Sequence, residues 1–388
     1  MDNPKIGIVG GGIGGLAVAI ALRVAGYPVE VYEQAERFAR VGADVNLTPN
    51  AVRALDGLGV GEQLRETAAR PSHRISRMWD TGNETSRLEM GEAAEQAYGS
   101  PQLTMHRADV LAALEAALPA GTIRFGKRLV ELEPDNATGC PRLRFTDGTE
   151  SEVDAVVGAD GIHSAVRTAL FGPEHPTFTG VVAYRAVIAA ERVTMPNSGA
   201  FTKWWGPDAD TQLVTFPLNR GRDMFVFATT PQADWHHESW TMPGSVMELR
   251  EAYRDFHPEA RAVLDACDEV LKSALYVRDP LPQWSSGPVT LLGDACHPMM
   301  PFMAQGAGMA IEDAVVLARA LREEGSGGIR AAFRRYEDAR KGRTCRIQIS
   351  SRSNTWLKKS TDAGWVYGYD AWTVPLDAPA TTGSAASR

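Results

Sequence analysis

The sequence lacks the features that mark secreted, metal-binding, membrane-spanning and nucleic-acid-binding proteins. Only four of its 388 residues are cysteines, and no two of them form a Cys-x-x-Cys pair, so neither a disulfide framework nor a zinc site is expected. No stretch has the roughly 20 apolar residues that span a bilayer, and the first residues do not resemble a secretory signal. Lys and Arg number 40 against 48 Asp and Glu, whereas nucleic-acid binding favours a basic excess. We therefore expect a cytoplasmic protein with no metal, membrane or nucleic-acid partner.

Glycine, with 37 residues, is plentiful, and its first cluster lies between an expected strand and an expected helix. The apolar run 5–9 predicts a buried parallel strand, the Ala- and Leu-rich run 16–24 predicts a helix that ends at Gly26, and 29–32 predicts a second strand. Gly-x-Gly-x-x-Gly between strand and helix is the spacing that lets backbone N–H groups approach a pyrophosphate. Glu33 ends the second strand, where an acid accepts hydrogen bonds from ribose hydroxyls. The motif predicts a dinucleotide site with the candidate residues Gly10, Gly12, Gly14, Gly15, Glu33 and Gln34.

Two later turns also follow apolar runs that predict buried strands. Asp160 comes after the run 153–157, with a polar helix start behind it, and Asp294 comes after the run 289–292. The run Gly306-Ala307-Gly308 then opens an apolar helix, whose first N–H groups carry the positive end of the helix dipole. Taken alone, the turn at Asp160 also fits an ordinary strand–turn–helix connection. The glycine-rich run 306–308 also fits a helix start without a ligand.

From residue 180 onward the pattern changes to short strand-like runs at 181–187, 202–205, 212–216 and 224–228. Such a series predicts an antiparallel sheet. We therefore predict an α/β protein in which a discontinuous Rossmann-like domain carries an inserted antiparallel-sheet substrate-binding domain. The first domain is assigned residues 1–72, 100–178 and 276–340, and the second 73–99 and 179–275. Residues 341–376 are expected to form a helical C-terminal segment and 377–388 a disordered tail.

The three motifs, in this order, resemble those of the class A flavoprotein monooxygenases, which share the fold of para-hydroxybenzoate hydroxylase. That family has Gly-x-Gly-x-x-Gly first, an Asp-Gly motif in the middle and a Gly-Asp motif late in the chain, and the resemblance covers almost the whole sequence. It implies that the Rossmann-like domain binds FAD. The predicted contacts of this cofactor are Asp160, Asp294, Gly306, Ala307 and Gly308, with Arg40 and Arg107 as further contacts.

The resemblance also implies a reaction. NADH or NADPH would reduce FAD, O2 would add to the reduced flavin as a C4a-hydroperoxide, and this species would hydroxylate a small aromatic or heteroaromatic ring. One branch of the family shares runs such as 202–205 and 365–369 with this chain. In that branch, attack at a carboxylate-bearing carbon can release carbon dioxide, so decarboxylative hydroxylation stays open. A homodimer is a further expectation from the family.

Several positions of the expected substrate pocket differ from that branch. Asn46 and Asp210 stand where the branch has histidines, and Phe201, Val214 and Phe302 replace its Cys, Tyr and His. Because a site built to hydrogen-bond a polar substrate rejects analogues that lack those groups, the exchange predicts an altered substrate with an additional or larger apolar ring system. The candidate catalytic residues are Asn46, Tyr184, Asp210 and His297, and the candidate pocket residues are Phe201, Val214, Pro298, Met299 and Phe302.

Each of these candidates also has an ordinary structural interpretation. Tyr184, expected on a strand that faces the flavin, equally fits a core aromatic, and Asp210 equally fits an exposed loop carboxylate. His297 fits a histidine that hydrogen-bonds backbone groups, and the pair 204–205 fits sheet packing. At the level of function, a natural-product or antibiotic-modifying hydroxylase, a non-catalytic flavin-binding protein and a nicotinamide-only dehydrogenase remain alternatives.

Overall fold

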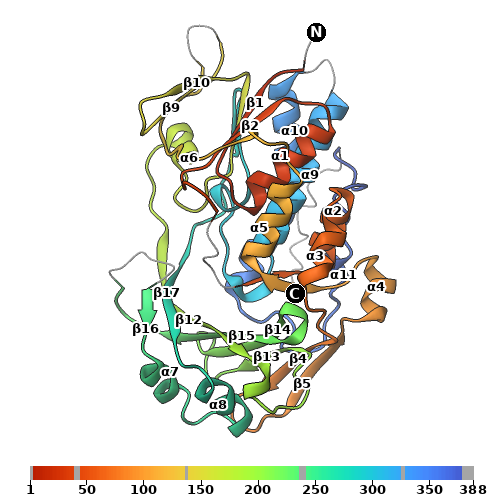
Figure 1. The fold of residues 1–388 in the computed structure, drawn as a ribbon, viewed down its shortest axis with the longest axis vertical. Coiled ribbons are helices and arrows are strands. Elements are labelled where there is room, and N and C mark those ends of the chain that lie inside the picture. The colour runs from red at the N-terminus through yellow and green to blue at the C-terminus, as the bar shows by residue number, and fades with distance from the viewer. Residues whose placement is uncertain (1–2, 39–43, 136–138, 236–241, 325–327, 378–388) are drawn as a thin grey trace, which may run out of the picture.

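The computed structural model describes residues 3–38, 44–135, 139–235, 242–324 and 328–377, and these form an α/β structure with two large sheets (Figure 1). Arg40 and all but the first residue of the expected disordered tail lie outside the described residues. In Figure 1 one sheet and its helices occupy the upper part of the molecule, and the other sheet occupies the lower part. The predicted α/β class is confirmed.

The upper sheet is almost entirely parallel, with the strand order β18-β19-β11-β1-β2-β7 and only the β18–β19 pair antiparallel. Its strands are β1 (Ile6–Val9), β2 (Val29–Tyr32), β7 (Ile123–Arg124), β11 (Ala155–Gly158), β18 (Ser285–Ser286) and β19 (Val289–Leu291). Strands β1, β11 and β19 are buried along their whole length, as parallel strands covered on both faces must be. Three apolar runs from distant parts of the sequence therefore lie side by side.

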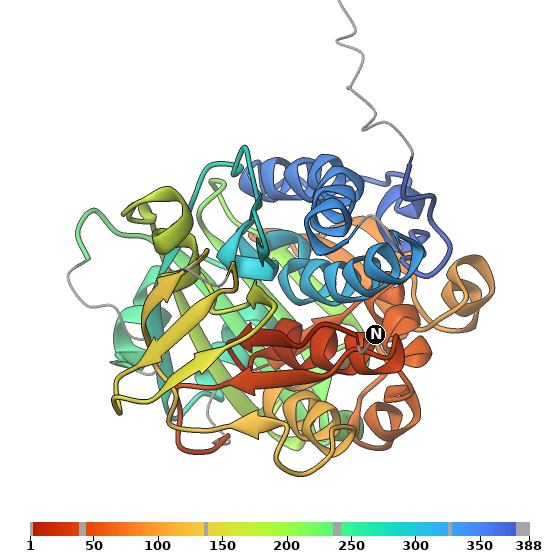
Figure 2. The ribbon, with the colours of Figure 1, turned by 90° about the horizontal axis from the view of Figure 1, so that it is seen from above.

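Helices cover one face of the parallel sheet, and a small antiparallel sheet covers the other (Figure 2). Helix α1 (Ile13–Val24) contacts both α5 (Arg107–Ala116) and α9 (Gly306–Glu324), and α10 (Ile329–Arg352) packs on α9. The small sheet has the order β10-β9-β8. Its strands are β8 (Leu129–Glu133), β9 (Arg142–Phe145) and β10 (Glu150–Glu152), and helix α6 (Ala165–Phe171) contacts β8. Helix α1 ends, as predicted, where Gly26 adopts φ +92°.

The lower sheet has eight strands in the order β16-β17-β12-β15-β14-β13-β4-β5, and only its β13–β4 pair is parallel. The strands are β4 (His73–Met78), β5 (Glu84–Glu89), β12 (Thr177–Ala189), β13 (Phe201–Trp205), β14 (Gln212–Leu218), β15 (Asp223–Pro231), β16 (Met242–Gly244) and β17 (Val270–Val277). One face packs on α7 (Val246–Ala252) and α8 (Pro258–Asp265), and the other forms a second apolar cluster with Met300 and Phe302. These strands come from residues 73–89 and 177–277, and the division into domains stays a prediction.

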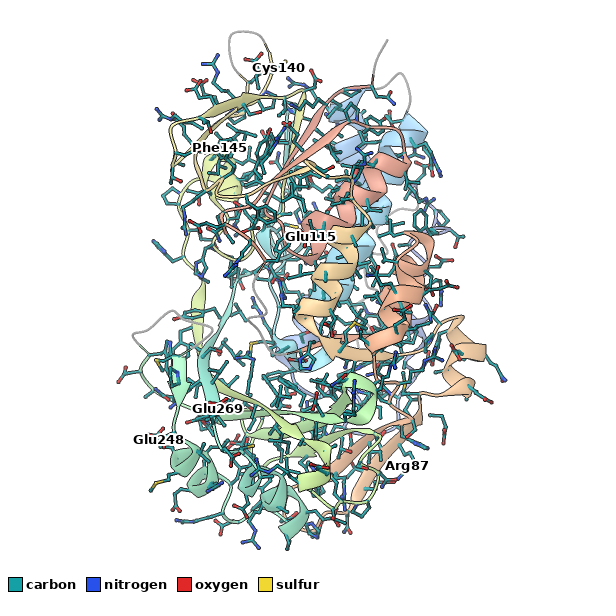
Figure 3. All side chains as sticks on the ribbon, in the orientation of Figure 1. Arg87, Glu115, Cys140, Phe145, Glu248 and Glu269 are labelled. Atoms are coloured by element: carbon teal, nitrogen blue, oxygen red, sulfur yellow. The ribbon has the colours of Figure 1, made fainter. Side chains whose placement is uncertain are left out.

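The remaining elements connect the two parts of the molecule. Strands β3 (Asp44–Leu47) and β6 (Leu103–His106) form a two-stranded sheet, and the further helices are α2 (Pro49–Gly57), α3 (Gly61–Thr67), α4 (Glu92–Tyr98) and α11 (Gly364–Tyr367). The segment 341–376 is helical only in part, because α10 ends at Arg352 and the short α11 follows after a gap. Among the described residues, no helix combines the length and the apolar character needed to cross a bilayer. Charged side chains such as Arg87, Glu115 and Glu248 are exposed on both parts (Figure 3).

Candidate functional site

The three motif turns meet at one edge of the parallel sheet. Gly10 follows β1, Asp160 lies just after β11 and Asp294 lies just after β19, and these strands are parallel neighbours in the order β19-β11-β1. The chain continues from β1 to β2 on one side, whereas β11 lies on the other side. The end of β1 is therefore the place where the strand order reverses, and ligands of open α/β sheets bind outside the carboxyl ends of the strands at such a place.

The glycines of the first turn are required for different reasons. Gly10 has φ +104°, and a Cβ there would lie 2.4 Å from the carbonyl oxygen of Ala159. A Cβ on Gly15 would lie 1.9 Å from the carbonyl oxygen of Gly10, whereas a Cβ on Gly12 would meet no atom within 4 Å. Packing within the protein thus explains Gly10 and Gly15. Gly12 instead borders open space at the N-terminus of α1, where free N–H groups can bind a phosphate.

Two of the other predicted cofactor contacts also have roles within the protein. A Cβ on Gly14 would lie 2.7 Å from Leu292 Cδ2 and 3.0 Å from Ala310 Cβ, so this glycine allows the close approach of α1 to α9. The Glu33 carboxylate accepts hydrogen bonds from the N–H groups of Gly11 (2.7 Å) and Ala35 (2.8 Å). These bonds fix the glycine-rich turn to the end of β2, and the predicted contact of Glu33 with a ribose stays a prediction. Gln34 is exposed beside Glu33.

Asp160, the acid of the middle motif, caps a helix. Its carboxylate accepts hydrogen bonds from the hydroxyl of Ser164 (2.5 Å) and from the N–H groups of Ala165 (2.7 Å) and Val166 (3.1 Å) at the start of α6. Burial raises the pKa of Asp160, and these hydrogen bonds lower it in part. The acid therefore holds α6 against the end of β11, next to the glycine-rich turn, and its predicted cofactor contact is untested.

The surroundings of two acids near this edge lead us to infer a recess there. Asp294 is exposed to solvent, yet the protein that surrounds it raises its pKa against the charges of His297 and Arg107. Asp44 is half-buried, and burial raises its pKa to about 6 against the charges of Arg185 and Arg107. A carboxylate that touches water while protein surrounds it lies in a recess rather than on a convex surface. The charge of Arg107 lowers the pKa of both Asp44 and Asp294, so the three side chains lie near one another.

The N-terminus of α9 provides another wall of this region. The glycine-rich run at 306–308 forms its first turn, Gly306 and Ala307 are half-buried, and the nearest atom to a Cβ on Gly306 would be Met299 Cγ at 4.0 Å. The helix has 19 residues, so the positive end of its dipole and its free N–H groups favour a negative charge in front of it. A phosphate-binding turn, an accessible acid and a helix N-terminus along one recess fit FAD, which has both phosphates and a ring edge that gains negative charge on reduction.

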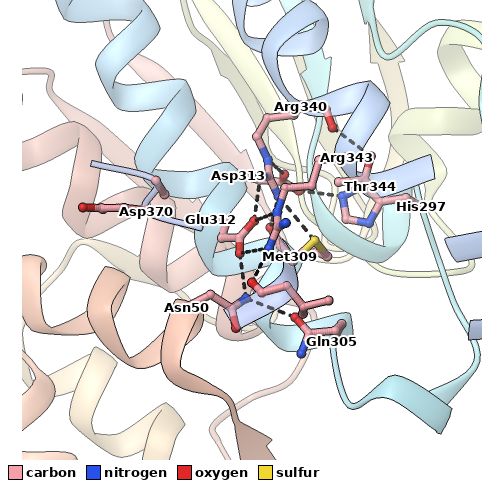
Figure 4. A network of polar contacts seen from close by, with 12 residues as sticks. Asn50, His297, Gln305, Met309, Glu312, Asp313, Arg340, Arg343, Thr344 and Asp370 are labelled. Carbon is pink, nitrogen blue, oxygen red and sulfur yellow. Dashed lines mark hydrogen bonds and ion pairs between the residues drawn. The ribbon is translucent and has the colours of Figure 1, made fainter. Parts of the chain in front are cut away.

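A buried network of charged side chains lies behind these turns (Figure 4). Glu312 and Asp313 are adjacent on α9, and Arg340 and Arg343 are three residues apart on α10. Arg340 Nη1 lies 2.7 Å from Glu312 Oε2, and Arg340 Nε donates a hydrogen bond to Asp313 Oδ1 at 2.7 Å. Arg343 Nε donates to Glu312 Oε2 at 2.8 Å. Glu312, Asp313 and Arg340 have no exposed side-chain surface, so every charge in this core depends on its partner.

The network holds the turns that border the recess. Asp313 Oδ2 lies 2.6 Å from His297 Nε2 and also accepts a hydrogen bond from the N–H of Gly293 at 3.2 Å. The amide of Asn50 donates to Glu312 Oε1 (2.7 Å) and to the side-chain oxygen of Gln305 (3.0 Å), directly before α9. Burial alone would raise the pKa of Asp313, but His297 and Arg340 lower it below its ordinary value. His297, a candidate catalytic residue from the sequence, is thus a buried partner of an ionised carboxylate.

The same place contains a trio of side chains with metal-ligand chemistry. The ligand atoms of Cys296, His297 and Asp313 lie within 4.8 Å of one another, and all three residues are buried. The His297 ring and the Asp313 carboxylate are already hydrogen-bonded to each other, and burial raises the pKa of the Cys296 thiol far above its ordinary value. Because a metal binds the thiolate, this trio is better described as part of the hydrogen-bonded network.

The structure brings three of the predicted pocket residues together. Phe201, Val214 and Phe302 belong to one apolar cluster on the face of the lower sheet that meets the turn before α9. Phe201 stacks on Phe216 with ring centroids 5.1 Å apart. Pro298 is buried in the turn after Asp294, whereas Met299 is half-buried and packs on a neighbouring cluster.

The other candidate catalytic residues are dispersed. Asn46 is 7% exposed, and its side-chain oxygen accepts a hydrogen bond from Gln102 Nε2 at 2.8 Å. Tyr184 lies on the sheet face opposite to that of Phe201. Strand alternation places Ala183 in the apolar cluster of Phe201 and Tyr184 in the cluster beneath α7 and α8. Asp210 is exposed in the connection between β13 and β14, in agreement with its ordinary interpretation.

Sequence reasoning missed the charged network and one buried lysine. Glu312 and Asp313 interrupt the apolar run 306–318, and Arg340 and Arg343 have the spacing of one helix face. These two signals could have predicted a buried ion-pair cluster. Lys203 lies in the run 202–205 that the family branch shares, and the structure places it in the interior at 4% exposure.

Comparison with known proteins places the chain in a family. A family model described as "FAD binding domain" matches residues 4–347. The chain is 41% identical over 379 residues to 6-hydroxynicotinate 3-monooxygenase of Bordetella bronchiseptica, and this match covers 96% of the chain and 97% of that enzyme. The chain belongs to the FAD-binding aromatic monooxygenases. A 3-amino-4-hydroxybenzoate 2-monooxygenase of Streptomyces platensis is 35% identical and covers 95% of this chain and 97% of its own.

Solved structures agree with this assignment. A salicylate hydroxylase in complex with substrate has a TM-score of 0.82 at 25% identity and covers 95% of this chain and 96% of its own. HpxO of Klebsiella pneumoniae, in complex with FAD and uric acid, has a TM-score of 0.78 at 24% identity, and the match covers 93% of this chain and 90% of HpxO. At this identity the likeness supports the fold alone. The expected Rossmann-like, FAD-binding fold of the aromatic monooxygenases is confirmed, as is the resemblance to the 6-hydroxynicotinate branch.

Proposed function

We propose that this monooxygenase uses NADH or NADPH and O2 to hydroxylate a small aromatic or heteroaromatic substrate other than 6-hydroxynicotinate. The observation that carries the proposal is the junction of two surfaces. The recess at the carboxyl edge of the parallel sheet fits FAD, and the apolar cluster of Phe201, Val214 and Phe302 lies on the neighbouring sheet face. The cytoplasmic location and the homodimer remain predictions.

Each surface has a defined task in this proposal. The N–H groups at the start of α1, beside Gly12, bind the pyrophosphate, and Asp294 accepts hydrogen bonds from hydroxyls of the cofactor. The N-terminus of α9 stabilises negative charge at the edge of the ring system. When bound, FAD supplies the hydride-accepting and oxygen-activating chemistry. The apolar cluster orients the substrate ring and excludes water from the reacting atoms.

The pocket chemistry supports a substrate change relative to 6-hydroxynicotinate 3-monooxygenase. Phe201, Val214 and Phe302 offer no hydrogen-bonding group, and the amide of Asn46 cannot act as a general base, in contrast to a histidine. Such a pocket favours a ring with more apolar surface, because each extra buried CH₂ group is worth about 0.8 kcal/mol. The masses of the products distinguish hydroxylation with loss of carbon dioxide from hydroxylation alone.

The decisive experiment measures NADH and NADPH oxidation by the FAD-loaded protein, with and without 6-hydroxynicotinate, and determines the product masses. We expect little stimulation by this compound, and strong stimulation with a hydroxylated product from another phenol, aniline or hydroxylated heteroaromatic acid. Strong stimulation by 6-hydroxynicotinate would show that the exchanged positions do not set specificity. If FAD is bound but no aromatic compound stimulates NAD(P)H oxidation, the non-catalytic flavin-binding alternative would instead be favoured.

A further inference from the structure

Lys203 stands at the centre of the predicted pocket residues. It follows Phe201 by two positions on β13, which places both side chains on the same face. Its direct neighbour on β14 is Val214, and its Nζ lies 5.5 Å from the ring centroid of Phe302. The side chain is buried, with 4% of the residue exposed. A cationic residue therefore lies among the side chains that make the pocket apolar.

The environment of Lys203 contains positive charge, and its direct contacts are with neutral groups. Its Nζ donates a hydrogen bond to Asn354 Oδ1 at 2.6 Å and lies 3.7 Å above the Trp205 ring. The charged groups that act on it are Arg74 and Lys358, and together with burial they lower the pKa of Lys203 well below its ordinary value. Within the part of the chain that the structure describes, no carboxylate forms an ion pair with Lys203. A buried cation without a counter-charge is costly.

Arg74 extends this positive region. Its guanidinium lies 4.3 Å from the ring centroid of Phe201, and its Nη1 donates to the hydroxyl of Tyr367 at 3.1 Å. Arg74 is 5% exposed, and among the described residues it too has no carboxylate partner. Two buried cations thus flank the apolar cluster from one side, and their field favours an anion between them and the recess.

Unpartnered polar atoms lie beside Lys203. Gln212 is directly opposite Trp205 in the β13–β14 pair, on the face that also carries Lys203 and Val214. It is 1% exposed, and neither its amide nitrogen nor its amide oxygen has a hydrogen-bond partner. The indole N–H of Trp205 also has none. Because buried polar groups are normally satisfied, these atoms indicate a polar group that the protein itself does not supply.

We propose that Lys203, with Gln212 and the Trp205 indole, forms the anchoring site for the carboxylate of an aromatic acid whose ring lies against Phe201, Val214 and Phe302. The inference rests on the proposed function and names the anionic class of its substrate. The carboxylate supplies the missing negative charge, and the lysine, amide and indole N–H groups supply the donors that it requires. Asn354, which holds Lys203 in the free protein, gives way to the stronger, charged acceptor.

Two alternative explanations of these polar groups, a structural role of Lys203 and an ordered water, lead to different predictions. If Lys203 serves only to hold the segment around Asn354, its replacement weakens the fold and leaves ligand preference unchanged. If an ordered water satisfies Gln212 and Trp205, an acid and its amide bind equally well. The anchoring site alone predicts a preference for acids that disappears with Lys203.

The test uses the FAD-loaded full-length protein and needs no turnover. Salicylate, 3-hydroxybenzoate and 6-hydroxynicotinate are titrated against their carboxamides, and binding is followed by the change in flavin absorbance. The variant is Lys203→Met, which keeps length and removes charge. The matched control is Lys272→Met, whose ammonium lies 5.0 Å from the ring of Tyr184 on the opposite face of the sheet.

We expect at least one acid to bind about 10-fold or more tightly than its amide, a difference worth about 1.4 kcal/mol. This preference is lost in Lys203→Met and kept in Lys272→Met. Without ligand, Lys203→Met melts at or above the wild-type temperature, because an unpaired buried charge has been removed. Equal binding of acids and amides, failure of every acid to perturb the flavin, or an acid preference that survives Lys203→Met would each overturn the proposal.

The outcomes separate this site from the proposed function. Lys203-dependent binding of an acid without any hydroxylated product would retain the anchoring site and reject hydroxylation of that acid. Efficient hydroxylation of neutral phenols by both wild type and Lys203→Met would retain the function and reject the anchoring site.

Discussion

Replacement of Arg340 tests whether the buried network stabilises the protein. Arg340 is fully buried, with one guanidinium nitrogen 2.7 Å from Glu312 and another 2.7 Å from Asp313. In Arg340→Met, Glu312 keeps Arg343 and Asp313 keeps His297, but each carboxylate loses its closest fully buried cation. Removal of one member of a buried ion pair costs about 3–5 kcal/mol. We therefore expect a loss of this size in the free energy of unfolding, measured by urea denaturation of the apoprotein and the FAD-loaded protein.

The dependence of this loss on pH gives a second readout. Arg340 and His297 lower the folded-state pKa of Asp313, so its ionised form stabilises the wild type above its unfolded pKa, and this contribution disappears as the pH falls through the folded pKa. The difference between wild type and Arg340→Met should therefore shrink as the pH falls below about 4, the ordinary pKa of an aspartate. Arg335→Met on the same helix removes partly exposed ion pairs and should cost no more than about 1 kcal/mol. An Arg340→Met loss no larger than that of this control would refute the reasoning.

Three further predictions concern the cofactor recess. Gly12→Ala should leave the stability of the apoprotein within about 0.5 kcal/mol of wild type, because the added Cβ meets no protein atom within 4 Å. The same Cβ should weaken FAD binding about 10-fold or more in a fluorescence titration, because it occupies the space of the pyrophosphate. Unchanged affinity would place the pyrophosphate elsewhere. Gly15→Ala should abolish a stable, flavin-binding fold, judged by melting and flavin content, since its Cβ would lie 1.9 Å from the carbonyl oxygen of Gly10. Burial raises the folded-state pKa of Asp44 to about 6, so ionisation of this carboxyl group destabilises the folded protein. Asp44→Asn should therefore be more stable than wild type by an amount that grows between about pH 4 and 6 and stays constant above about pH 6. A stability difference independent of pH would contradict the burial of this carboxyl group.

The cofactor edge could be predicted because its determinants are local. An apolar run followed by glycine or aspartate predicts a buried strand and a turn, and this rule located the ends of β1, β11 and β19 in the sequence. Their adjacency is implied by the predicted discontinuous Rossmann-like domain, and the strand pairing shows it. Strand β5, at the edge of the sheet, was not predicted, since its residues are exposed or half-buried and Leu88 is its only apolar side chain.

The substrate side could be predicted only in part, because its determinants are distant in sequence. A strand residue faces one side or the other according to register, so Tyr184 and Ala183 could not be distinguished before the sheet was known. Arg340 meets Asp313 across 27 positions of sequence, and the pairing depends on how α10 packs on α9. The surroundings of Lys203 likewise come from Asn354 and Lys358, far along the chain.

The order of the strands in the sequence has a consequence for biosynthesis. The glycine-rich turn after β1 leaves the ribosome first, whereas β19 begins only at Val289 and the arginines of α10 follow at positions 340 and 343. Domains fold as units during synthesis once their segments have emerged. A nascent chain that ends before β19 has the pyrophosphate turn and the capped α6, but neither Asp294 nor the N-terminus of α9. Under the proposed assignment of these groups to the flavin, we expect its capture to be a late event in synthesis, after the start of α9 has left the ribosome.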